Sequence, residues 1–215
     1  MRRTKEDAAK TRAAIIDAAL GCFDRHGIAG STLDHIAQAA NCTKGAIYHY
    51  FDGKAAILHE LRDQVSVPML DEADCELLHE REVPALERIE RLLLGILDAV
   101  ETNGRTRQAI TVMQLRCEYV NGLEKELEGA ARNQVRMARA FETAYREARK
   151  AGQLAPGLSP EVAAAETTMF LSGLLRLSLI HDEHGVLRKN GRAAVRAHVA
   201  SKGVRHQTRM VSDTI

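Results

Sequence analysis

Residues 31–51 carry two short apolar periodicities separated by one asparagine, and this feature constrains the fold more than any other. The segment reads STLDHIAQAANCTKGAIYHYF. Ser31 and Thr32 are residue types that favour a helix N-cap, and Asp34, three residues after Ser31, is placed to form a capping box. Apolar residues then recur at spacings of three and four, which predicts one short helix with a single buried face: Leu33, Ile36, Ala37 and Ala40.

A turn and a second short helix are expected to follow. Asn41 stands where the chain must turn, and asparagine tolerates the left-handed backbone that ends many helices. Thr43 is placed to cap the second helix, which can pack on the first through Ala46, Ile47 and Tyr50. The outer side would then hold Lys44, Gly45, Tyr48 and His49. Two short helices joined in this way place the second one in the major groove, so the expected partner is double-stranded DNA.

The same residues resemble the DNA-binding region of the TetR family of bacterial regulators, whose pattern reads T-x-x-x-I-A-x-x-A-G-V-S-x-G-x-x-Y-x-x-F-x-x-K-x-x-L. The matching positions are Thr32, Ile36, Ala37, Ala40, Asn41, Cys42, Thr43, Gly45, Tyr48, Phe51, Lys54 and Ile57. Two departures are mild, because Asn41 can adopt the backbone angles of the usual glycine and Cys42 is a small hydrophobe like the usual valine. A buried helical hairpin that never meets DNA is the alternative, and the polar, cationic outer side disfavours it.

Roles follow for the residues of the DNA-binding set. Lys44 and His49 are candidates for contacts to base edges. Thr43 and Tyr48 would hold phosphates. Lys54 matches a lysine that touches a DNA phosphate in the family, and Gly45 would let the backbone approach the duplex closely. The full predicted set is Thr32, Thr43, Lys44, Gly45, Tyr48, His49 and Lys54.

The composition fits a cytoplasmic regulator with one small and one medium domain. The chain has 215 residues, of which 45% are hydrophobic and 27% charged, and it has no run of about 18 uncharged apolar residues, so no membrane span is expected. The basic N-terminus precedes no apolar run of the kind found in signal peptides. Although the net charge is only +1, cations crowd the first twelve residues, at Arg2, Arg3, Lys5, Lys10 and Arg12. This arm either contacts DNA phosphates or is a solvated tail.

Neither a metal site, a cofactor nor an enzymatic activity is expected. The four cysteines, at positions 22, 42, 75 and 117, have no C-x-x-C spacing, so reduced thiols are expected, with Cys75 or Cys117 as the alternative redox sensor. His181 and His184 flank an acidic pair at an expected helix end, where solvation is favoured over metal binding. No G-x-S-x-G, H-E-x-x-H or G-x-x-x-x-G-K-[ST] motif occurs.

The whole chain is predicted to be all-α, with about nine helices. A helix over residues 5–26 should end at Gly27. The helix that begins at Gly53 after a cap by Asp52 should kink or break near Val67 because of Pro68. The later helices are expected over residues 69–79, 84–102, 106–120, 124–151, 159–181 and 192–202. Residues 1–53 are then a helix-turn-helix DNA-binding domain, residues 54–204 a helical ligand-binding and dimerisation domain, and residues 205–215 a tail.

Residues 109–120, AITVMQLRCEYV, resemble the corresponding part of the AcrR-like subgroup, through Leu115, Arg116, Cys117, Glu118 and Tyr119. Members of that subgroup repress multidrug efflux genes and release DNA when a lipophilic drug enters the helical domain. The resemblance therefore implies a small lipophilic inducer and a mostly apolar pocket. The candidate lining residues, for which plain core packing is the alternative, are Leu93, Leu97, Val112, Met113, Arg116, Met169, Phe170 and Gly173.

A homodimer on a palindromic operator is expected, because one short recognition helix reads only a few base pairs. Residues 159–181 offer more apolar surface than one monomer needs to bury, and with the last helix they could form half of a four-helix bundle, as in the family. The predicted dimer contacts are Phe170, Leu174, Leu177, Val195 and Val199. The leading hypothesis is a ligand-released repressor of a multidrug efflux operon. An activator, or a regulator of a catabolic or stress operon controlled by a partner protein, is the alternative.

Overall fold

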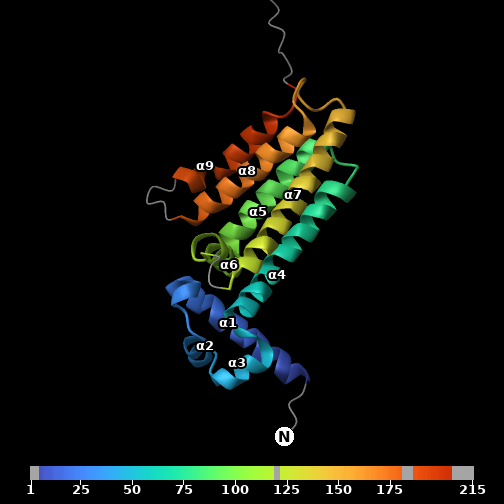
Figure 1. The fold of residues 1–215 in the computed structure, drawn as a ribbon. Coiled ribbons are helices and arrows are strands. Elements are labelled where there is room, and N and C mark those ends of the chain that lie inside the picture. The colour runs from blue at the N-terminus through green and yellow to red at the C-terminus, as the bar shows by residue number, and fades with distance from the viewer. Residues whose placement is uncertain (1–4, 119–121, 181–185, 205–215) are drawn as a thin grey trace, which may run out of the picture.

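The computed structural model describes residues 5–118, 122–180 and 186–204, with the backbone only for residues 186–188. It confirms the predicted all-α architecture: apart from one isolated bridge between Leu154 and Gly203, all regular structure in the described ranges is helical. Three helices form a unit at one end of the molecule, namely α1 (Lys5–Gly30), α2 (Leu33–Ala39) and α3 (Lys44–Tyr50). The long helix α4 (Gly53–Asp74) leads from this unit into a larger bundle (Figure 1).

The bundle is built from five further helices and one π-helical turn. The turn η1 (Cys75–His79) follows α4 directly, and the helices are α5 (Ala85–Thr102), α6 (Gly104–Leu115), α7 (Glu124–Lys150), α8 (Pro160–Leu179) and α9 (Val186–Ala200). In Figure 1, α6 lies at the lower end of the bundle, between the bundle and the three-helix unit, and α8 and α9 form one outer side. Several helix starts were predicted correctly, since Thr43 and Ser159 cap α3 and α8 with their side-chain oxygens.

Of the kink or break predicted near Val67, the break is wrong, because α4 continues through Pro68 to Asp74. Proline removes one backbone N–H, but Pro68 lies on the exposed side, where water can satisfy the carbonyl that loses its donor. The helical geometry changes instead at η1. The fully buried Arg88 holds this turn by donating from Nη1 to the Leu77 carbonyl at 2.6 Å, while its Nη2 pairs with Glu147 of α7.

Other boundaries also differ from the predictions. Helix α6 ends at Leu115, not near residue 120, and α9 begins at residue 186, six residues before the predicted start. Pro84 is the N-cap of α5 and does not occupy the first helical position. Asp52 is the N-cap residue of α4, but its side chain makes no capping hydrogen bond. Gly27 has a φ of +70° and interrupts the first helix as expected, after which one more helical turn runs to Gly30.

The hydrophobic core of the three-helix unit continues into the bundle. Ile15, Phe23, Ile36 and Ile47 are buried in one cluster together with Ile57 and Leu61 of α4 and with Ala109 and Val112 of α6. A second cluster fills the far half of the bundle, between α5, α7, α8 and α9. Buried apolar contacts therefore join α6 and the N-terminal half of α4 to the three-helix unit.

An ion pair on the surface reinforces this junction. Arg12 of α1 donates from Nη1 and Nη2 to the two carboxylate oxygens of Glu60 on α4, at 2.6 and 2.8 Å, and its guanidinium lies 5.0 Å from the centre of the Phe51 ring. Hydrogen bonding to Arg12 lowers the pKa of Glu60 to about 2. The α1–α4 orientation is thus fixed by both apolar packing and a bidentate pair.

Candidate functional site

Side-chain caps and one left-handed residue define the geometry of the helix-turn-helix. Thr32 Oγ1 accepts from the backbone N–H of His35 at 3.1 Å, and Thr43 Oγ1 accepts from that of Ala46 at the same distance. Asn41 has a φ of +50°, as expected for the turn. The two caps fix where α2 and α3 begin, and Asn41 sets the turn between them.

The capping box predicted for Asp34 is wrong. Ser31 Oγ donates to the Gly27 carbonyl at 2.7 Å, so Thr32 alone caps α2. The Asp34 carboxylate instead accepts from Lys44 Nζ at 2.9 Å. Both groups are exposed, and the attraction between opposite charges on neighbouring helices competes with a reach back to the backbone. Lys44 is thus paired within the chain in this structure.

The outer face of α3 is exposed as predicted. Ile47 is fully buried and Ala46 and Tyr50 are half-buried against the core, whereas Tyr48 is 56% exposed. The exposed residues of this face are Thr43, Lys44, Gly45, Tyr48 and His49, and Thr32 is exposed at the start of α2. A short helix with an ammonium, an imidazole, a phenol, a hydroxyl and a glycine on one accessible side has the chemistry to enter a major groove.

Lys54 lies differently from the other members of the predicted set. Its Nζ donates to the carbonyls of Ile28 and Ser31, both at 2.7 Å, and to that of Ala29 at 3.3 Å. The ammonium therefore closes the C-terminal end of α1 and the loop before α2, where carbonyls lack helical partners. A phosphate contact by Lys54, which stays a prediction, would have to share the ammonium with these carbonyls.

Replacing Lys54 with methionine should destabilise the three-helix unit. Loss of a charged donor that serves three carbonyls is expected to lower the free energy of unfolding by about 1–3 kcal/mol. Urea unfolding followed by circular dichroism measures this loss. The control is Lys125→Met, because Lys125 is exposed in the first turn of α7. Equal stability of the two variants would contradict the capping role.

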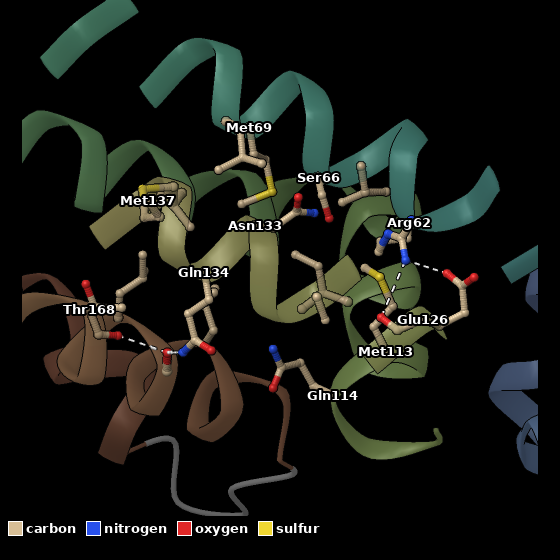
Figure 2. A pocket seen from close by; sticks show the side chains of 18 of the residues that line it. Arg62, Ser66, Met69, Met113, Gln114, Glu126, Asn133, Gln134, Met137 and Thr168 are labelled. Carbon is tan, nitrogen blue, oxygen red and sulfur yellow. Dashed lines mark hydrogen bonds and ion pairs between the residues drawn. The ribbon is translucent and has the colours of Figure 1, made fainter. Parts of the chain in front are cut away.

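A cavity of about 300 Å³ lies in the bundle, between α4, α5, α6, α7 and α8. Figure 2 shows its lining residues, with α4 above and α8 below. Its apolar lining includes Leu58, Met69, Ile110, Met113, Met137 and Leu171. Its polar lining includes Arg62, Ser66, Gln114, Glu126, Asn133, Gln134 and Thr168. A mainly apolar cavity with a few polar groups is typical of small-molecule sites, and three methionines allow the wall to adapt.

Of the eight predicted lining residues, only Met113 lines this cavity. Leu93, Leu97 and Val112 are buried core residues outside its lining, and Met169 is 65% exposed. The Phe170 ring stacks on His198 with 4.2 Å between the ring centres, and a Cβ added at Gly173 of α8 would meet no atom within 4 Å. Arg116 follows the end of α6 and lines a separate hollow beside Lys54. Apolar positions on helices do not distinguish cavity from core in the sequence, and most of the predicted lining residues that are buried fill the core.

Sequence analysis missed the polar residues of the cavity. Positions 126, 130, 133, 134 and 137 recur at the spacing of one face of α7, and Arg62, Ser66 and Met69 do so on α4. Such mixed faces resemble solvated surface in a single sequence. The detectable signal was that Asn133 and Gln134 share a face with Met137 on a helix whose apolar stripe is otherwise regular.

Two polar clusters project into the cavity wall. Arg62 of α4 forms a buried ion pair with Glu126 of α7 (Figure 2). On the opposite side, Gln134 Nε2 donates to Ser172 Oγ at 3.1 Å, and Ser172 Oγ donates to the Thr168 carbonyl at 2.9 Å. Both clusters join α7 to another helix, so a molecule in the cavity would meet the groups that hold these helices together.

Helix α6 connects the cavity with the three-helix unit. Ile110, Met113 and Gln114 line the cavity on one side. On the other side, Arg105 Nη2 donates to Asp17 Oδ1 at 2.8 Å and Gln108 Nε2 donates to Asp24 Oδ2 at 3.0 Å. At its C-terminal end, the Arg116 carbonyl accepts from the Ile28 N–H. A displacement of α6 would therefore act directly on α1.

The outer side of α8 carries an exposed apolar stripe. Val162, Met169, Leu177 and Ile180 are each between 46% and 65% exposed. By length and composition alone, α8 is the one described helix that could cross a membrane. Glu166 and Arg176 interrupt its apolar sequence, and its other side packs on α7 and α9.

Two of the predicted dimer contacts are wrong. Val195 is fully buried and Val199 is 4% exposed, because both pack into the second core cluster of their own chain. The face of α9 that stays exposed carries Ala193, Ala194, Ala197 and Ala200 instead. Phe170 and Leu174 are half-buried and Leu177 is exposed, so these three remain available at the edge of the α8 stripe.

Within the described residues, no three His, Cys, Asp or Glu side chains gather as metal ligands would. His181 and His184 lie outside the described ranges. Cys22 is buried, Cys42 and Cys117 are half-buried, and Cys75 is exposed.

Comparison with known proteins gives matches to both parts of the chain. Residues 15–61 match the family model of bacterial regulatory proteins of the tetR family, and residues 84–201 match the C-terminal region of MAATS-type transcriptional repressors. The transcriptional regulator TtgR of Pseudomonas putida is 32% identical over 184 residues, which cover 84% of this chain and 85% of TtgR.

Two solved structures resemble the whole architecture. Native NalD, described as the secondary repressor of the MexAB-OprM multidrug efflux pump in Pseudomonas aeruginosa, superposes with a TM-score of 0.81 at 26% identity, covering 93% of this chain and all of NalD. A complex of SmeT with triclosan gives 0.79 at 27% identity, covering 92% and 93% of the two chains. SmeT is described as the repressor of the Stenotrophomonas maltophilia pump SmeDEF.

Proposed function

The chain belongs to the TetR family of bacterial regulatory proteins, and on this premise we propose that it is a cytoplasmic, homodimeric repressor of a multidrug efflux operon. A small lipophilic ligand would enter the cavity between α4 and α8 and release the protein from its operator. The observation that carries this proposal is the cavity itself, because α6, which forms part of its wall, also contacts α1 of the three-helix unit.

On DNA, α3 of each protomer would enter a major groove. Lys44 and His49 would reach base edges, Thr43 and Tyr48 would hold phosphates, and Thr32 would contact the backbone from the start of α2. Gly45 has only its own cap residue near the position of a Cβ, so the duplex could approach the backbone there. Lys54 would act mainly by bracing the end of α1, through the three carbonyls that it bonds.

The two protomers would associate through α8 and α9. The exposed stripe of Val162, Met169, Leu177 and Ile180 offers an apolar face, and the alanines on α9 would let two helices approach closely. A two-fold axis through this face would pair the α8 helices and set the separation of the two α3 helices. A palindromic operator with half-sites about one helical turn apart, or a multiple of it, follows from such a dimer.

Ligand binding would weaken operator binding through α6 and α4. A ligand that fits only when α6 shifts would move Asp17 and Asp24 of α1 through their contacts with Arg105 and Gln108. Helix α4 would follow, since Arg12 ties it to α1. The distance between the two α3 helices would then no longer match the spacing of the half-sites. The ligand-bound conformation would therefore bind the operator more weakly than the ligand-free one, as allosteric release requires.

An electrophoretic shift assay with the intergenic DNA beside this gene tests the proposal. The wild type should retard the fragment, and triclosan should weaken binding by about 5- to 150-fold, the usual range of allosteric coupling. The control is Ala130→Phe, which places a ring in the cavity wall and should remove the response to triclosan without removing DNA binding. Absence of a retarded band with the wild type would refute the repressor function.

A further inference from the structure

We propose that Arg62 makes the cavity selective for amphiphilic organic anions, whose acidic group binds Arg62 in place of Glu126. This inference rests on the proposed function, because it specifies the chemistry of the ligand that the same cavity takes. Among the described residues that line the cavity, only Arg62 and Glu126 carry a formal charge. Their side chains are 8% and 10% exposed, so water screens them little. Arg62 would attract an anionic ligand and repel a cationic one, and Glu126 would do the reverse.

Arg62 is the fixed member of the pair. Its Nε and Nη2 donate to Asp63 Oδ1 at 3.3 and 3.1 Å, and Nη2 lies 2.7 Å from His59 Nδ1. Nη1 also reaches the backbone carbonyl of Glu126 at 3.4 Å. Gly129 leaves the space that the guanidinium occupies, because a Cβ at that position would overlap with Nη1 of Arg62. Arg62 would therefore keep its place even if the Glu126 carboxylate moved away.

Glu126 is the replaceable member. Within the described part of the chain, its carboxylate contacts two side chains, Arg62 and His59, and both belong to α4. A ligand carboxylate that binds Arg62 would restore the charge-assisted hydrogen bonds that Glu126 gives up. A cationic ligand, by contrast, would have to lie beside a guanidinium that Asp63, His59 and the Glu126 carbonyl hold in place. Replacement of the Glu126 carboxylate by a ligand carboxylate thus keeps the buried Arg62 guanidinium paired.

The exchange also explains how the binding of an anionic ligand could affect the three-helix unit. The Arg62–Glu126 pair joins α4 to the first turn of α7. When a ligand carboxylate takes over Arg62, α4 loses this tie, and α4 is the helix that enters the three-helix unit. The apolar body of the ligand would meanwhile lie against Met69, Met113 and Met137, which line the same space (Figure 2).

Calorimetric titration with 2-naphthoate and with 2-naphthamide, at pH 7.5, tests the inference. The two probes share their ring system and nearly their shape, but only the first is an anion. We expect the wild-type protein to bind 2-naphthoate at least about tenfold more tightly than 2-naphthamide. In the double variant Arg62→Gln, Glu126→Gln, which leaves no unpaired charge buried, this ratio should fall to about one. Equal binding of both probes by the wild type, or an unchanged ratio in the double variant, would overturn the inference.

A second variant tests the position of Arg62 without changing any charge. Gly129→Ala should displace the guanidinium and reduce the naphthoate preference, while Gly95→Ala, in a helix position with open space, should keep it. Operator binding by the wild type, measured separately, distinguishes the two hypotheses. DNA binding without a naphthoate preference overturns only the ligand assignment. A naphthoate preference without DNA binding overturns only the repressor function.

Discussion

Replacing Tyr48 with alanine is expected to weaken operator binding by about 30- to 1,000-fold, because a contact to phosphate worth about 1–2 kcal/mol is lost in each of two protomers. Tyr48 is 56% exposed on α3, so its removal should leave the fold intact. A titrated electrophoretic shift assay at fixed salt measures the change. The dependence of affinity on salt concentration should also become shallower if the contact is to the DNA backbone.

The control for this prediction is Val67→Ala. Val67 is another exposed large residue, 42% accessible, but it lies on α4, well after the three-helix unit. This variant should bind the operator as the wild type does. Wild-type affinity of the Tyr48 variant would mean that α3 does not present this face to DNA, and the predicted interface would have to be abandoned.

A charge placed in the apolar stripe of α8 should have the second large effect. Met169→Arg is expected to convert the dimer into monomers, because two-fold symmetry introduces the charge twice into the same desolvated face. Since each monomer would then hold only one half-site, operator affinity should fall by about 10²- to 10⁴-fold. Light scattering coupled to size-exclusion chromatography gives the mass, and the shift assay gives the affinity.

Leu127→Arg is the matched control, because Leu127 is also exposed, at 52%, but lies on α7. It should remain dimeric and bind the operator. A Met169→Arg protein that still has the mass of a dimer would exclude the α8 stripe as the interface. The apolar face would then need another partner, and the arrangement of the recognition helices would have to be derived from that partner.

The helix-turn-helix was predictable because its signals are local. Thr43 caps the helix that it precedes, Asn41 adopts the left-handed conformation at the turn, and Ile47 is buried while Tyr48 is exposed. Each of these follows from residue types a few positions apart. Asp34 was mispredicted because its partner, Lys44, lies on the next helix, and a local pattern does not contain that contact.

The cavity and the dimer surface depend on long-range packing, and the predictions were weaker there. Leu93 and Leu97 have the same apolar character as true lining residues such as Leu171, and only the tertiary arrangement separates core from cavity. Pro68 predicts a kink or a break, because the sequence alone does not show which side of the helix faces water. Arg62 gives no signal in the sequence, because a lone arginine on a helix is usually solvated.

The cluster of buried side chains shared by α1, α4 and α6 limits how this protein could be re-engineered as a biosensor. A chimera that exchanges only the first 53 residues would place foreign side chains against Ala109 and Val112 of α6 and would lose the partners of Arg105 and Gln108. Retargeting to a new operator should therefore be done either by changing the exposed positions of α3 alone or by transplanting α6 together with the amino-terminal half.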